Sequence, residues 1–150
     1  MLLNKTLSAL LGIVIVLICW FFLSTDSSYQ LAFKAKFYYQ MQDFKKAYDF
    51  SQKAYELDRY NRLAMTLLRQ SKDALRISEY LGLGDEYMAK IRAMASAFVS
   101  GADRERIRLM CEIMIDDFSR LKEVKGTNLY KKASEMMSDF KRLKDELFSE

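Results

Sequence analysis

The chain has 150 residues, with 24 basic and 20 acidic side chains, no proline and no histidine. The lack of proline and the many alanine, leucine, methionine, lysine and glutamate residues predict an all-α fold. Without histidine the chain can build neither a histidine general base nor an imidazole metal site. Its five glycines form no phosphate loop or dinucleotide fingerprint, and acidic residues interleave the basic ones. We therefore expect no enzyme activity, no cofactor and no nucleic-acid partner.

A charge-free run, LSALLGIVIVLICWFFL, extends from Leu7 to Leu23. About 20 apolar helical residues cross a bilayer core of about 30 Å, so the run predicts a single transmembrane signal anchor over residues 1–24. It ends in bulky aromatic residues, which are typical of a retained membrane helix, whereas a cleaved signal peptide ends in small residues. A cleaved signal peptide and an ordinary buried helix are the alternatives.

Within this run, Ser8 and Gly12 lie one helical turn apart and offer a small-residue contact to another membrane helix. Lysines flank both ends of the run, so the positive-inside comparison leaves the side of the soluble domain open. The expected location is a membrane, as a single-pass protein of the bacterial inner membrane, with residues 7–23 in the lipid bilayer.

Helix-capping and helix-breaking residues divide the rest of the chain into about six antiparallel helices joined by short connections. Residues 25–28 form a short linker after the anchor. The expected helix starts and stops are Asp43, Asn61, Gly82-Leu83-Gly84 followed by Asp85, Gly101 followed by Asp103, and Gly126 followed by Thr127. We expect residues 62–150 to complete one domain with residues 28–61.

Small and aromatic residues recur in residues 28–61 in a specific order: Ala35 and Tyr38, then Asp43-Phe44, then Ala47 and Ala54 before Leu57-Asp58. This 34-residue stretch resembles a tetratricopeptide repeat, in which small residues let two helices approach closely. Arg59 and Ser51 depart from the family pattern, and a shift by 34 residues finds no good second repeat. The resemblance implies a helix pair that binds proteins, with a less regular continuation.

Ten of the twenty aromatic residues fall between Tyr29 and Tyr60. In this family the first helix of a repeat lines the ligand-facing side, so the resemblance implies a protein-binding face. Its residues are Tyr29, Ala32, Lys36, Tyr39 and Gln40. The alternative is that these residues belong to the core or its rim without a ligand. Phe37, Phe44, Phe50 and Tyr55 are expected to fill the space around the helix contact.

The last helix carries an apolar seam with spacings of four and three residues. Its residues are Leu129, Ala133, Met136, Phe140, Leu143 and Leu147. We expect the seam to pack on the preceding helices; a coiled coil between subunits is the alternative. Cys111 lies among apolar residues and is expected to be a buried thiol. The carboxylates Glu112, Asp116 and Asp117 are a weak acid/base candidate, because Arg108 and Arg120 lie near enough to neutralise them.

Together these patterns predict a membrane-anchored, tetratricopeptide-like adaptor or assembly chaperone. Its partner would be a membrane-embedded protein, for example in a secretion or flagellar motor complex. A self-associating scaffold, forming a homo-oligomer through the C-terminal apolar seam, is the alternative function, and a regulatory enzyme subunit is a third.

Overall fold

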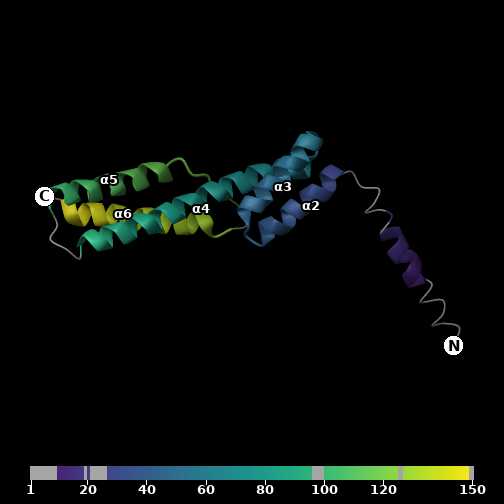
Figure 1. The fold of residues 1–150 in the computed structure, drawn as a ribbon, viewed down its shortest axis with the longest axis horizontal. Helices are drawn as coiled ribbons and strands as arrows, with labels where there is room; N and C mark the ends of the chain where they lie inside the picture. Colours follow the sequence, from purple (N-terminus) through teal and green to yellow (C-terminus); the bar gives the residue numbers. More distant parts are fainter. Residues whose placement is uncertain (1–9, 19, 21–26, 96–99, 125–126, 149–150) are drawn as a thin grey trace, which may run out of the picture. The chain divides into compact units, whose positions relative to one another are not determined.

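All regular secondary structure that the computed structural model describes is α-helical, which confirms the all-α prediction for that part of the chain (Figure 1). The described residues are 10–18, 20, 27–95, 100–124 and 127–148. Residues 10–18 and 20 are helical. The helices that follow are α2 (Ser27–Gln40), α3 (Phe44–Leu57), α4 (Arg62–Ala95), α5 (Gly101–Phe118) and α6 (Leu129–Phe148).

The predicted transmembrane run is described only in part, because its residues 7–9, 19 and 21–23 lie outside the described residues. The large apolar side chains of residues 10–18 are exposed, and so is Trp20. In the described ranges, no helix combines the length and the apolar character that crossing a membrane requires. The predicted single-pass helix and inner-membrane location are therefore wrong for the part of the chain that the structure describes.

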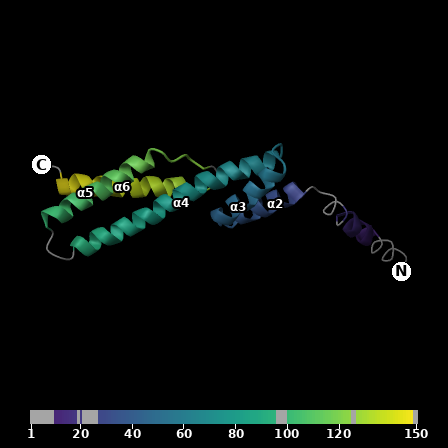
Figure 2. The same ribbon diagram turned by 45° about the horizontal axis from the view of Figure 1, so that its top comes forward.

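The chain forms two compact units, Met1–Arg69 and Gln70–Glu150, and the boundary between them lies within α4. In the first unit, α2 and α3 form a helical hairpin whose two helices lie side by side (Figure 2). Ala32 of α2, Ala54 of α3 and Ala64 of α4 are fully buried in one cluster. Because alanine adds only a methyl group, α2 and α3 can pack closely at this cluster.

The predicted helix pair therefore exists in residues 27–57, and several expected details are confirmed. Asp43 caps α3 by accepting a hydrogen bond from the Lys46 amide, 3.1 Å away. Ala47 is fully buried and Phe44 nearly so. Phe37 differs from the expectation: its side chain is 59% exposed and fills no core space.

In the second unit, α5 and α6 pack side by side and the second part of α4 lies against both. Ile77 of α4, Met114 of α5 and Phe140 of α6 are fully buried. The Tyr80 hydroxyl donates a hydrogen bond to the Met114 carbonyl oxygen, 3.1 Å away. Burial raises the pKa of Tyr80 to about 12, so this phenol is neutral at physiological pH.

The expected helix break at Gly82-Leu83-Gly84 is wrong, because α4 continues through it to Ala95. Buried α4 residues on both sides of the glycines, among them Ile77, Tyr80 and Ile91, stabilise the helix. Each such side chain contributes about 1.5–3 kcal/mol, which outweighs about 1 kcal/mol lost per glycine. Gly84 also has a packing role, since a side chain there would collide with the Met136 sulfur of α6.

The helix start expected near Asp103 is shifted to Ser100, which caps α5 in a capping box with Asp103. The α6 seam packs within the second unit, as expected, with Ala133 and Phe140 fully buried. Cys111 is also fully buried, which confirms the predicted buried thiol, and desolvation raises its pKa. Gly126 lies outside the described residues.

Candidate functional site

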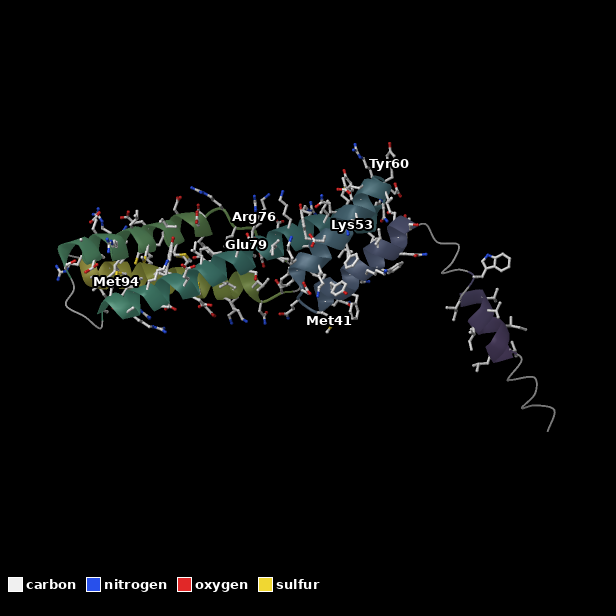
Figure 3. All side chains as sticks on the ribbon, viewed as in Figure 1. Met41, Lys53, Tyr60, Arg76, Glu79 and Met94 are labelled. Carbon is white, nitrogen blue, oxygen red and sulfur yellow. The ribbon has the colours of Figure 1, made fainter. Side chains whose placement is uncertain are left out.

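Four large apolar side chains lie exposed along one side of α2 and the residue that follows it. Tyr29 is 40% exposed, Phe33 55%, Phe37 59% and Met41 66%. Their spacing of four residues places them in one row along the helix. We name this row the α2 face. Figure 3 labels Met41 at the end of the row.

The opposite side of α2 is firmly packed. Ser28, Ala32 and Ala35 are buried, and the Ser28 hydroxyl donates a hydrogen bond of 2.8 Å to the Ala54 carbonyl oxygen of α3. The Asn61 side-chain amide, also buried, donates to the Ser28 hydroxyl over 2.8 Å. The Asn61 side-chain oxygen Oδ1 in turn accepts from the Ala64 amide at the start of α4. Because these contacts fix the rotation of α2, the α2 face is held outward.

Lysines border the α2 face on both sides. With 3.6 residues per turn, Lys36 falls on one margin of the row and Lys34 on the other. Both lysines are exposed, and neither forms an ion pair with any described residue. The sequence of α2, SSYQLAFKAKFYYQ, contains no acidic residue. The α2 face is therefore an apolar row on a helix with positive charge alone.

The predicted binding residues divide between the two sides of α2. Tyr29, Lys36 and Gln40 are exposed, on the side of the α2 face. Ala32 is fully buried in the three-helix cluster and has no surface to offer a ligand. The Tyr39 ring is half-buried and packs edge-on against Phe44, with ring centroids 5.6 Å apart.

Sequence reasoning missed Phe33, Phe37 and Met41 as exposed residues. Their spacing from Tyr29 was a visible signal, because the row repeats every fourth residue. The opposite side of α2 is also apolar, so hydrophobic periodicity alone did not show which side is buried.

A second group of exposed apolar residues lies at the end of the hairpin opposite to Met41. Tyr60, in the turn between α3 and α4, is 94% exposed, Leu57 61% and Met65 52% (Figure 3). Tyr60 belongs to the turn and to no helix, and its backbone amide donates a hydrogen bond of 2.8 Å to the Asp58 carboxylate. This group is smaller and less regular than the α2 face.

Surface cavities of about 410 and 620 Å³ lie among the described residues of the second unit. The smaller cavity lies between α4 and the end of α5, and its lining includes Arg76, Tyr80, Leu83 and Arg120. The Arg120 guanidinium is already paired with Asp116 at 2.6 Å and Asp117 at 3.4 Å. The same pairs engage two of the three carboxylates considered for acid/base chemistry.

The third of these carboxylates, Glu112, forms an ion pair with Lys144 of α6 over 3.0 Å. The Lys144 ammonium lowers the pKa of Glu112 through a hydrogen bond and its charge. A lowered pKa is the opposite of what a general acid at neutral pH requires. Among the described residues, no group of three or more metal-ligating side chains is placed to hold an ion.

Of the two residues predicted to contact a membrane helix, Ser8 lies outside the described residues. Gly12 is exposed, and apart from its own helix backbone and chain neighbours no described atom lies within 4 Å of where its side chain would begin. The contact stays a prediction.

Comparison of the chain with known proteins finds no matching family, no similar curated protein and no similar solved structure. The likeness of residues 28–61 to a tetratricopeptide repeat therefore stays a prediction.

Proposed function

We propose that this protein is a protein-protein interaction module that works as an adaptor, and that it binds its partner through the α2 face. The observation that carries the proposal is the exposure of Tyr29, Phe33, Phe37 and Met41 in one row. Aromatic side chains and methionine are enriched in the centres of protein interfaces, where they bury much area and lose little conformational entropy. Exposed as a contiguous row, they mark an interaction site more strongly than scattered apolar residues do.

The rigidity of the helix pair supports the same proposal. A binding surface that is already ordered loses less entropy on association than a flexible one. The buried hydrogen bonds from Ser28 and Asn61 hold α2 in one rotation, so the row is presented in a fixed geometry. The tetratricopeptide-like pattern of residues 28–61 agrees with a protein-binding role.

The scaffold alternative, in which the α6 seam joins two subunits, has less support. Ala133 and Phe140 at the centre of the seam are fully buried within the second unit. Of the seam residues, Leu147 near the end of α6 is exposed, at 49%. An intersubunit coiled coil needs several exposed heptads rather than one residue.

Site-specific photocrosslinking in the native cells tests the proposal. A photoreactive phenylalanine at position 33 should give a discrete crosslinked product, whereas the same group at the exposed Lys53 position of α3 should not. The crosslinked protein is then identified and purified, and its affinity is measured for the full-length chain. The double variant Phe33→Ala/Phe37→Ala should weaken binding about thirtyfold or more, since each interface aromatic contributes about 1–3 kcal/mol.

Circular dichroism and thermal unfolding of the double variant provide the folding control. Both phenylalanines are more than half exposed, so the helical signal should be unchanged. If the purified partner binds the double variant as tightly as the original chain, the α2 face is not its binding site.

A further inference from the structure

We infer that the α2 face receives an amphipathic α-helix of another protein, with an apolar stripe bordered by acidic residues. This inference rests on the proposed function and names the chemistry of the partner.

The length and geometry of the row favour a helical partner. From Tyr29 to Met41 the row extends over about 18 Å, which corresponds to more than three helical turns. Residues spaced by four form a ridge, and such a ridge packs into the groove between ridges of a second helix. A partner helix with apolar residues at positions i, i+3, i+4 and i+7 presents a stripe of the same length.

The backbone of α2 argues against an extended partner peptide. Peptides that bind as strands add to a sheet edge, where unpaired backbone amides and carbonyls accept them. The amides and carbonyls within α2 are engaged in its own helical hydrogen bonds. Recognition through the α2 face therefore depends on side chains, as it does when helices pack.

The positive charges around the row favour a partner with negative charge. Residues 27–69 contain eight basic and four acidic side chains, whereas residues 70–150 contain fifteen of each. The net positive charge of the folded chain is therefore concentrated in the segment that carries the α2 face. On neighbouring α3, Lys45 is paired with Asp49 at 3.3 Å and Lys46 with Asp43 at 2.9 Å.

Lys34 and Lys36, by contrast, form no ion pair with a described residue, and they border the row on opposite sides. Carboxylates on both margins of an incoming helix would pair with them, and a basic helix would be repelled. A second copy of this chain fits poorly, because two α2 helices would bring four lysines together without any acidic residue on either helix.

The test measures binding of synthetic helical peptides to the full-length protein by fluorescence anisotropy. The acidic probe is an amphipathic peptide of about 18 residues, with leucines at the stated spacing and glutamates on both margins. The basic probe replaces each glutamate by lysine, and a third peptide has the acidic composition in scrambled order. We expect the acidic probe to bind about tenfold or more tighter than either of the others.

Two charge-reversal variants make the result specific to this surface. Lys34→Glu/Lys36→Glu should invert the preference, so that the basic probe binds tighter than the acidic one. Lys53→Glu is the control, because it reverses the charge of an exposed lysine on α3, outside α2 (Figure 3), and should leave the preference unchanged. Raising the salt concentration from about 0.05 to 0.5 M should weaken the acidic probe several-fold, because salt screens exposed charges.

The outcomes separate the inference from the proposed function. Equal binding of acidic and basic probes overturns the inference, and so does binding of neither probe. If neither peptide binds, the inference is also overturned when the chain binds anionic phospholipid vesicles through Phe33. The same holds when sedimentation shows that the chain dimerises through Phe33. In each case a protein crosslinked at position 33 would leave the proposed function standing. If position 33 captures no protein, the proposed function fails.

Discussion

Two buried polar residues, Ser28 and Asn61, connect α2, α3 and the start of α4. Asn61 donates to Ser28, which donates to the Ala54 carbonyl, and both bonds are 2.8 Å long. Replacing Ser28 by alanine would leave the buried Asn61 amide without this acceptor. The free energy of unfolding should fall by about 1–3 kcal/mol, the cost of an unsatisfied buried polar group. Urea denaturation measures the change, and the exposed Ser78→Ala should change it by less than about 0.5 kcal/mol.

Tyr39, in contrast to Ser28 and Asn61, buries a polar group that no described residue satisfies. Its hydroxyl is buried and has no hydrogen-bond partner among the described residues, and this desolvation raises its pKa. Tyr39→Phe removes the hydroxyl and keeps the ring on Phe44, so unfolding should require about 1 kcal/mol more. Tyr80→Phe is the matched control, because its hydroxyl donates to the Met114 carbonyl and its loss should destabilise by about 1 kcal/mol. Equal effects of the two substitutions would contradict this account.

The turn between α2 and α3 forms with one residue in the left-handed conformation. The Gln42 amide donates to the Tyr39 carbonyl and the Asp43 amide to the Tyr38 carbonyl, which is a Schellman motif. Gln42 has φ of +61°, a region where a side chain is unfavourable. Gln42→Gly should therefore raise the free energy of unfolding by about 0.5–1 kcal/mol, which is measured as a higher thermal midpoint. Gln52→Gly in the middle of α3 should lower the free energy of unfolding by about 1 kcal/mol. If Gln52→Gly raised it instead, the left-handed conformation of Gln42 would not explain the effect of Gln42→Gly.

The two glycines within α4 are expected to respond differently to alanine. Gly82 has open space where a side chain would begin, so Gly82→Ala should add about 1 kcal/mol from helix propensity. At Gly84 the added methyl meets the Met136 sulfur and forces that side chain to move. The free energy of unfolding of Gly84→Ala should be about 1 kcal/mol below that of Gly82→Ala. Similar values for the two variants would show that Met136 moves without cost.

The helix caps could be predicted from the sequence, whereas the course of α4 and the buried side of α2 could not. Helix caps at Asp43 and Asn61 were predictable, because a polar side chain can satisfy an amide a few residues ahead in the chain. The continuation of α4 through Gly82 and Gly84 was not, because it depends on α6 packing that is remote in sequence. For the same reason the sequence favoured Ala32 as a binding residue and assigned Phe37 to the core. Both sides of α2 are apolar, and contacts with α3 and α4 decide which is buried.

At the scale of the whole molecule, carboxylates that stabilise the fold are spread over both units. Asp43 caps α3 in the first unit; in the second, Asp103 belongs to the α5 cap and Glu112 links α5 to α6. Hydrogen bonds lower the pKa of all three: to Lys46 for Asp43, to Ser100 for Asp103 and to Lys144 for Glu112. A carboxylate with a lowered pKa binds protons less readily in the folded chain than in the unfolded one. Its contribution is therefore complete above the pKa of the unfolded group, about 4, and is lost as pH falls through the lowered value.

The thermal midpoint of the chain should accordingly fall as pH is lowered from about 6 to about 3. The variant Asp43→Asn/Asp103→Asn/Glu112→Gln should show a smaller fall, because amides do not titrate and asparagine still caps a helix. Its midpoint near pH 6 should lie below that of the original chain, since the Lys144 pair loses its charge attraction. Calorimetry at several pH values measures both slopes. If the thermal midpoints of the two proteins fall equally with pH, other acidic groups determine the stability in acid. A smaller fall for the variant means that Asp43, Asp103 and Glu112, which each hold one helix end or one helix pair, determine it.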